Sequence, residues 1–417
     1  MKRLLLFFIL PFLLLMLNCN KSFIVLPPKN SASNLDGTVS ISDTLLSNMN
    51  GIYKSTVMSG GLGIEFVCKT SKKKVSFFSN LDGIFMILNS GFNPADSSIQ
   101  FSGFWRFSES KTQGNVTLSI AKDEGASDLL QNGNPSSILL KGNYVDGNGN
   151  AQPLSIQFER QFSDYTKTHD FSIFAHHGVQ TTADPPYEEN SLNGVLNDEG
   201  YGVTGLEFDV HLTKDGVPIC AHDASVNDRV TAKGPVFGPY IQYTFAFIEN
   251  YIRLIDGQKI PSVEQVLTAF VDSTNLTEMW LDVKGDPDIF KYLEPIVKAA
   301  YARAASIGRN VKIIADLPSK DVIDEFNKQP SYGASLPSMC ELSLQDAIDN
   351  HCQYFAPRYT LGLLLDDVDK AHSMGIRVYS WTLNSKVQIA DYLQHGRFDG
   401  FISDYPAYVN YYYYTLF

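Results

Sequence analysis

Three common sequence signatures are missing from this chain. No strongly basic stretch occurs and the formal net charge is −12, which argues against a nucleic acid partner. No CxxC pair occurs among the five cysteines, which argues against a zinc or thioredoxin-type site. No GxGxxG turn follows the first predicted strand of the C-terminal half, which argues against a doubly wound, dinucleotide-binding sheet.

Hydrophobic residues, in contrast, are plentiful. They make up 44% of the chain, and aromatic residues make up 12%. This composition is enough for a large core and excludes a disordered chain. The length of 417 residues is enough for two or three domains.

The N-terminus has the pattern of a secretory signal. Two basic residues precede an apolar run at 4–17, which is short for a membrane span, and Cys19 follows. The pattern resembles a bacterial lipoprotein signal with Cys19 as the lipidated residue, although Asn18 stands where a small residue is usual. Ordinary cleavage and an uncleaved anchor are the alternatives. We therefore expect residues 1–19 to be a lipoprotein signal peptide, and the protein to be exported and anchored by lipid to a membrane of the bacterial cell envelope.

Two further segments precede the C-terminal half. Residues 20–45 are rich in Ser, Asn, Pro and Asp, and this composition predicts a flexible tether. Residues 46–165 contain short alternating apolar runs separated by Gly, Asn and Asp turns, which predict an antiparallel β sandwich or barrel. No catalytic constellation occurs there, so a packing or binding module is expected. The predicted strands include 75–77, 85–92, 99–107, 116–120, 138–144 and 154–158.

Strands alternate with helical patterns over residues 170–417. This alternation predicts a parallel sheet covered by helices, and the length fits a (β/α)8 TIM barrel of the α/β class. The predicted strands are 171–175, 203–210, 278–283, 311–315, 354–357, 376–381 and 400–403. The predicted helices are 262–272, 289–305, 319–327, 363–374 and 386–395.

Acidic residues occur on two of these strands in an unusual position. Glu207 and Asp209 lie two residues apart, so they share one face of a strand whose other face is apolar. Both faces of a barrel strand are buried, and unpaired buried carboxylates are costly. Asp282 and Lys284 repeat the spacing on a second strand. Three carboxylates at strand ends suit a hard divalent cation, and the alternative is a salt-bridge network around Lys284.

Histidines follow other strands of the predicted barrel. His176 and His177 end the first strand, and His222 ends another apolar run. In a barrel these side chains would face the same mouth, where imidazole is a natural acid or base near neutral pH. The alternative is that each histidine has only a structural role.

Eight short motifs of this half resemble the glycerophosphodiester phosphodiesterases, members of the phosphatidylinositol-specific phospholipase C-like barrel superfamily. The resemblance covers residues 170–410. No single motif is decisive, and the resemblance depends on the order in which the eight motifs occur. In order, the motifs are AHHG at 175–178, EENS at 188–191, GLEFDVHLTKDG at 205–216, CAHD at 220–223, IPSVEQVL at 260–267, LDVKG at 281–285, WTLN at 381–384 and GFISDYP at 400–406.

The resemblance implies roles for the residues named above. His176 and His222 match the catalytic histidines. The metal ligands would be Glu207, Asp209 and Asp282, and Asp282 stands where glutamate is more common. The implied cofactor is one divalent cation, Ca2+ or Mg2+.

Four residues would contact the substrate, and one of them departs from the family pattern. They are His177, Lys284, Trp381 and Glu189. His177 replaces the arginine of a His-Arg-Gly motif, which removes a charged bidentate fork. Arg229 is a candidate to approach the phosphate instead. Asp404 matches the end of the last strand, where it is expected to mark the fold more than to serve the chemistry.

The implied function is metal-dependent hydrolysis of glycerophosphodiesters to glycerol 3-phosphate and an alcohol, a reaction of lipid metabolism. One alternative is a sphingomyelinase D-like phospholipase on the same barrel, with a lysophospholipid-type substrate. Another is a catalytically impaired, surface-exposed binding lipoprotein, an idea that depends on His177 in place of arginine.

Overall fold

The structure is a computed structural model that describes residues 35–57, 61–72, 74–178, 187–329 and 336–417. The predicted signal peptide with Cys19 and residues 20–34 of the predicted tether lie outside the described residues. Within the described ranges, no helix combines the length and the apolar character needed to cross a bilayer.

The last part of the predicted tether is packed against the folded body. Val39 pairs with Phe92 through two backbone hydrogen bonds of 2.8 Å, and Ile41 is buried. Helix α1 (Asp43–Ser47) follows and buries Leu46. The prediction of a tether up to residue 45 is therefore wrong at its end, because Ile41 and Leu46 join the core of the N-terminal barrel.

The N-terminal part forms a closed antiparallel barrel in which each strand pairs with the next and β1 pairs with β8. The alternation that predicted a sandwich or barrel is clearest in β6, where every second residue is buried. The strands are β1 (Gly51–Ser55), β2 (Glu65–Ser71), β3 (Lys74–Ser79), β4 (Phe85–Asn93), β5 (Ser98–Arg106), β6 (Gln113–Ile120), β7 (Leu139–Val145) and β8 (Ala151–Arg160). The turn η1 (Lys122–Ala126) and helix α2 (Ser127–Asn132) lie between β6 and β7. Aromatic side chains such as Phe77, Phe101 and Trp105 fill the interior.

The C-terminal part, which follows helix α3 (Asp164–Thr168), is a (β/α)8 barrel. Its eight parallel strands close because β10 pairs with both β9 and β14. The strands are β9 (Ser172–Ala175), β10 (Gly205–Leu212), β14 (Glu278–Val283), β15 (Lys312–Leu317), β16 (Ser338–Cys340), β17 (Tyr354–Phe355), β18 (Arg377–Ser380) and β19 (Gly400–Ser403). The short strand β11 (Pro218–Cys220) pairs with β10 in the antiparallel direction. Strand β12 (Ser225–Val226) pairs with β13 (Gly238–Pro239).

Helices surround this barrel. The longer ones are α6 (Val263–Ser273), α7 (Ile289–Ser306), α10 (Leu365–Ser373), α11 (Lys386–His395) and α12 (Pro406–Leu416). The shorter ones are α4 (Leu192–Asn197), η2 (Asp198–Tyr201), η3 (Tyr240–Gln242), α5 (Phe245–Tyr251), α8 (Lys320–Phe326), α9 (Leu344–Asp349) and η4 (Tyr359–Leu361). Helices α4, α5, α6, α8 and α9 each begin at a serine or threonine N-cap. Helix α6, for example, starts at a reciprocal capping box formed by Ser262 and Gln265.

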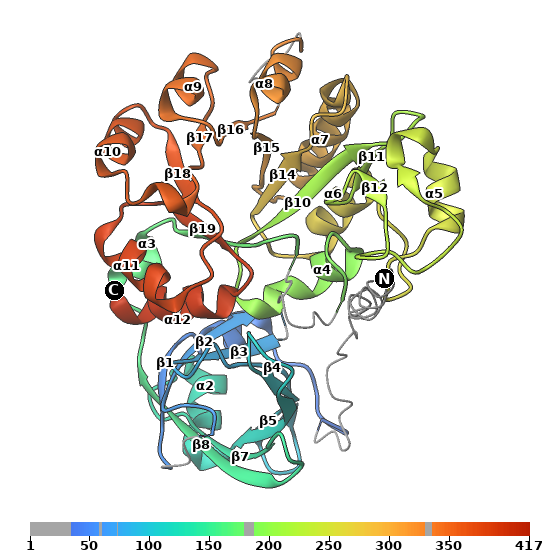
Figure 1. Cartoon of the computed structure of the whole chain (residues 1–417). Coiled ribbons are helices and arrows are strands. Elements are labelled where there is room, and N and C mark those ends of the chain that lie inside the picture. The colour runs from blue at the N-terminus through green and yellow to red at the C-terminus, as the bar shows by residue number, and fades with distance from the viewer. Residues whose placement is uncertain (1–34, 58–60, 73, 179–186, 330–335) are drawn as a thin grey trace, which may run out of the picture.

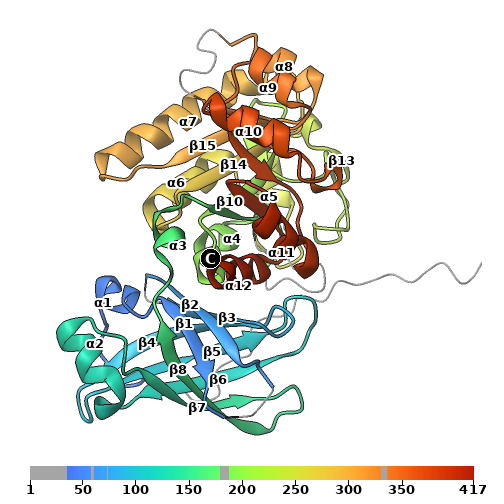
Figure 2. The ribbon, with the colours of Figure 1, turned by 90° about the vertical axis from the view of Figure 1, so that its left-hand side faces the viewer.

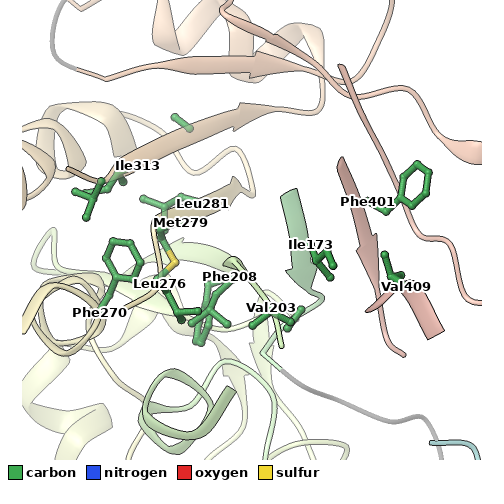
Figure 3. Packing of buried hydrophobic residues seen from close by; sticks show 14 of the residues in the cluster. Ile173, Val203, Phe208, Phe270, Leu276, Met279, Leu281, Ile313, Phe401 and Val409 are labelled. Carbon is green, nitrogen blue, oxygen red and sulfur yellow. The ribbon is translucent and has the colours of Figure 1, made fainter. Parts of the chain in front are cut away.

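Side-chain alternation on the parallel strands determines which residues face the site. On β14, Met279 and Leu281 point outward and pack near Phe270 of α6, as Figure 3 shows. Trp280 lies on the opposite face, in a separate cluster inside the barrel. The same alternation on β10 sends Phe208 outward, so the acidic residues of both strands point inward.

The two barrels share one hydrophobic core. Figures 1 and 2 both show α12 between the N-terminal barrel and the C-terminal strands. Phe85 on the outer face of β4 contacts Tyr201, with ring centroids 5.0 Å apart. Tyr414 of α12 stacks on Phe162 at 4.2 Å. The tyrosines at 411–414 therefore pack in this shared core, which buries part of the outer face of the small barrel.

Candidate active site

The acidic residues of β10 and β14 meet at the carboxyl ends of these strands. The parallel register places Asp209 directly beside Asp282, and Glu207 beside Trp280. The side chains of Glu207 and Asp209 are almost completely buried. One oxygen from each of the three carboxylates lies within 4.8 Å of the others. The three predicted metal ligands are therefore brought together in one cluster.

Lys284 neutralises only part of this cluster. Its Nζ lies 2.7 Å from Asp209 Oδ1 and 2.5 Å from Asp282 Oδ2. Burial disfavours its charge, but the two carboxylates raise the pKa of Lys284 above its usual value. Burial, followed by the charges of Asp209 and Asp282, raises the pKa of Glu207 well above its usual value. When all three carboxylates are ionised, as they would be with a bound cation, the one ammonium leaves two negative charges without a partner.

Two oxygens of the cluster are buried and have neither a hydrogen-bond partner nor an ion-pair partner in the described structure. They are Glu207 Oε1 and Asp282 Oδ1. A buried oxygen of this kind costs free energy unless a proton or a cation reaches it. Oxygen donors and a charge deficit of two fit one divalent cation held by Glu207, Asp209 and Asp282.

His177 lies against the same carboxylates. Its backbone has a positive φ of 54°, and its N–H donates to Glu207 Oε2 at 2.8 Å. Its Nε2 lies 3.4 Å from Asp209 Oδ2. Burial, followed by the neighbouring charge of His176, lowers the pKa of His177 to about 3. The imidazole is therefore neutral near pH 7.

Asn190 holds Asp209 in place on the other side. Its Nδ2 donates to Asp209 Oδ2 at 2.8 Å, and its Oδ1 accepts the backbone N–H of Asp209 at 2.8 Å. Asn190 also has a positive φ of 54°, and its N–H donates to the carbonyl of His177. Left-handed backbone at both residues costs free energy, and such strain persists where the surroundings fix it. The two loops therefore hold the cluster together at the barrel mouth.

His176 forms a pair with Asp404. The distance from His176 Nδ1 to Asp404 Oδ1 is 2.6 Å. Asn384 donates to the other oxygen of Asp404 at 2.7 Å and accepts its backbone N–H at 2.8 Å. Asp404 therefore orients His176, and the expectation that Asp404 chiefly marks the fold is wrong. The signal available in the sequence was the closure of the barrel, which places the last strand beside the first.

His222 has a matching carboxylate partner. Its Nδ1 lies 2.9 Å from Asp223 Oδ1, and 42% of its side chain is exposed. The ring of His177 lies between the other two, with centroids 3.7 Å from His176 and 4.9 Å from His222. His176 and His222 open on the same cavity.

Glu189 and Arg229 bind each other and do not line this cavity. Arg229 donates to both oxygens of Glu189, at 2.8 and 2.6 Å, and its Nε donates to Asp223 at 2.9 Å. The contact of Glu189 with the substrate stays a prediction, and in this structure both of its oxygens accept from Arg229. The same bonds occupy the guanidinium of Arg229, and they support the loop that carries His222.

The cavity has a volume of about 390 Å3 and collects side chains from the ends of all eight parallel strands. Sequence reasoning had identified Lys284 and Trp381 but missed Glu341 and Arg358. The guanidinium carbon of Arg358 lies 4.5 Å from the ring centroid of Trp381. Burial, followed by the charge of Asp282, raises the pKa of Glu341 to about 8. Glu341 directly follows β16 and Arg358 lies shortly after β17, and a position just after a barrel strand is the signal that could have found them.

The fold and the site define the class of this protein as a (β/α)8 barrel with carboxylates and histidines at its C-terminal mouth. Residues 176–329 match the family model described as Glycerophosphoryl diester phosphodiesterase family. Over these residues, the barrel that carries the site is similar to the glycerophosphodiester phosphodiesterase family.

Individual relatives are distant. Glycerophosphodiester phosphodiesterase 1 of Mus musculus is 27% identical over 151 residues, which are 35% of this chain and 43% of the relative. The human protein of the same name is 24% identical over 257 residues, which are 54% of this chain and 75% of the relative. The chain therefore spans less than half the length of the mouse relative. A solved Oleispira antarctica phosphodiesterase in complex with sn-glycerol-3-phosphate is 17% identical, with a TM-score of 0.45, over 58% of this chain and 96% of that chain.

Proposed function

We propose that the protein is a metal-dependent phosphodiesterase that hydrolyses glycerophosphodiesters to glycerol 3-phosphate and an alcohol. One observation carries the proposal: three inward carboxylates converge, with two unpartnered oxygens, on the cavity that His176 and His222 line. A divalent cation bound by Glu207, Asp209 and Asp282 would supply positive charge to a phosphate oxygen.

His176 and His222 would act as the acid and base pair. One imidazole takes the proton from the attacking oxygen, which is water or a hydroxyl of the substrate itself; in the second case a cyclic phosphate forms first, and water then opens it to the monoester. The new P–O bond forms as the bond to the alcohol breaks, and the other imidazole donates a proton to the departing oxygen. Asp404 and Asp223 each bind a ring Nδ1, which leaves Nε2 of both histidines for proton transfer.

Positively charged side chains would hold the substrate in place of the missing arginine. Lys284 lies at the carboxylate end of the cavity, and Arg358 lies with Trp381 on strands from the other side of the barrel. Arg358 is anchored by the indole ring and can form two hydrogen bonds with a phosphate. Glu341, close to Asp282, would face the polar end of the diester. These positions support a small, polar phosphodiester as the substrate.

The proposal is tested by alcohol release from a panel of diesters, with and without EDTA. The panel contains glycerophosphocholine, glycerophosphoethanolamine, lysophosphatidylcholine and sphingomyelin. Wild type should release alcohol from the glycerophosphodiesters only when a divalent cation is present. His176→Ala should lower kcat about 100-fold or more. His372→Ala is the matched control, because His372 also pairs with a carboxylate, at 2.9 Å, but lies outside the cavity.

Other results would redirect the proposal. Turnover of lysophosphatidylcholine or sphingomyelin alone would favour the phospholipase alternative. No turnover of any diester with any divalent cation would refute the enzyme and favour a binding protein. We also propose export and a lipid anchor at Cys19, which mass spectrometry of the protein extracted from membranes would test.

A further inference from the structure

The site departs from the family pattern at His177, and the geometry gives this residue a specific place. Its Nε2 lies 3.4 Å from Asp209 Oδ2 and 3.8 Å from Glu207 Oε2. Ligand atoms of His177, Asp209 and His222 lie within 4.8 Å of one another, as do those of His176, His177 and Glu207. The imidazole of His177 therefore belongs to the group of atoms that surrounds the proposed cation, and not to the periphery of the cavity.

The protein holds this ring firmly. The main chain of His177 is fixed on both sides, because its N–H donates to Glu207 and its carbonyl accepts from Asn190, each at 2.8 Å. Its Nδ1 faces Glu189 Oε2 at 4.0 Å. Histidines that bind metals usually direct their second ring nitrogen to a carboxylate or carbonyl, which fixes the tautomer. Glu189, fixed by Arg229, lies on that side of the ring but beyond hydrogen-bond distance, so the two main-chain bonds are what position His177 beside the carboxylates.

Charge distinguishes His177 from the arginine it replaces. An arginine at this position would add a permanent positive charge beside three carboxylates and Lys284. An imidazole can offer a ring nitrogen to a cation, which a guanidinium cannot, and Nε2 of His177 faces the oxygens of Asp209 and Glu207. His177 therefore favours the binding of a cation in this chain, and in particular of cations that bind nitrogen ligands.

We propose that His177 is a nitrogen ligand of the divalent cation, and that the site takes a first-row transition metal such as Mn2+ or Zn2+ in preference to Ca2+. The inference rests on the proposed metal-dependent function. Imidazole suits transition metals, whereas Ca2+ and Mg2+ prefer oxygen. A mixed set of carboxylates and imidazole therefore shifts the selectivity of the site away from the expected Ca2+ or Mg2+.

Pulsed electron paramagnetic resonance of Mn2+ bound to the whole protein tests this ligand without reference to turnover. Wild type should show a 14N coupling to Mn2+, which becomes a 15N coupling when the protein is made with 15N-labelled histidine. His177→Gln should lose the coupling and bind Mn2+ about 10-fold or more weakly, as measured by calorimetry. His177→Arg should lose it as well, and His372→Gln, altered outside the cavity, should keep it.

The outcomes separate this inference from the proposed function. Mn2+ bound without nitrogen coupling, or with coupling that persists in a folded His177→Gln protein, would overturn the ligand role and leave a metal-dependent enzyme in place. Equal affinity of wild type for Ca2+ and Mn2+ would overturn the selectivity. If no divalent cation bound to the wild type at all, both proposals would be overturned.

Discussion

The substitution Glu207→Gln should change the stability of the protein in opposite directions with and without a bound cation. Glutamine keeps the shape of the side chain and can still accept the N–H of His177, which donates to Glu207 at 2.8 Å. It removes the charge from an oxygen, Oε1, that has no hydrogen-bond partner in the described structure. We expect Glu207→Gln to be more stable than wild type in EDTA and less stable when the cation is present.

The size of both effects follows from linkage. A cation at about 100 times its Kd adds about 2.7 kcal/mol to the free energy of unfolding. An unfolding entropy of about 2.1 cal/mol/K per residue gives about 0.9 kcal/mol/K for this chain, so the cation should raise the Tm by about 3 °C. The variant should lose most of this rise.

The effect of Glu207→Gln on the metal-free protein depends on pH, and its sign follows from the pKa of Glu207. Burial raises the pKa of Glu207 above its usual value of 4.5, so the folded protein keeps a proton that the unfolded chain releases above that pH. The metal-free wild type therefore loses stability as pH rises from 4.5 towards the folded-state pKa. Each pH unit in this range costs about 1.4 kcal/mol, or about 1.5 °C, relative to Glu207→Gln.

Calorimetry in EDTA and in Mn2+, at pH 5 and pH 7, measures both effects. Glu264→Gln is the control, because Glu264 is exposed on α6 and should follow wild type in every condition. The reasoning fails if wild type and Glu207→Gln melt at the same temperature in EDTA at both pH values. It also fails if Mn2+ raises the Tm of both proteins equally.

Three further predictions concern the groups around the cluster. Asp404→Asn should lower kcat by about 100-fold or more, with KM little changed and an altered pH–rate profile, because His176 loses the carboxylate that orients it. Arg229→Met should lower the free energy of unfolding by about 3 kcal/mol in urea titrations, because it leaves Glu189 buried without a partner. Burial raises the pKa of Glu341 to about 8, so wild-type stability should fall between pH 4.5 and 8. In Glu341→Gln, the urea midpoint should lose that part of its pH dependence.

Periodicity alone was sufficient for most of the barrel. The predicted strands at 278–283 and 400–403 coincide with β14 and β19, and the other five predicted strands each overlap a barrel strand. The exception is β16, which is only three residues long and contains Ser and Cys in place of an alternating apolar run. Because that strand was missed, Glu341 directly after it was missed as well.

The site was predictable where it depends on spacing along one strand, and not where it depends on contacts across the fold. A spacing of two residues is enough to place Glu207 and Asp209 on one face. The pairing of His176 with Asp404 spans 228 residues and depends on barrel closure. The ion pair between Glu189 and Arg229 likewise depends on a loop conformation that no periodic pattern describes.

The contact between the two barrels limits how substrate reaches the cavity. Phe78 and Phe85 on the outer face of the small barrel are buried in the same core as the large one. A hinge motion between the barrels would bring these rings into water, and large apolar interfaces of this kind resist such motion. A substrate would therefore reach the cavity at the strand ends without any separation of the two barrels.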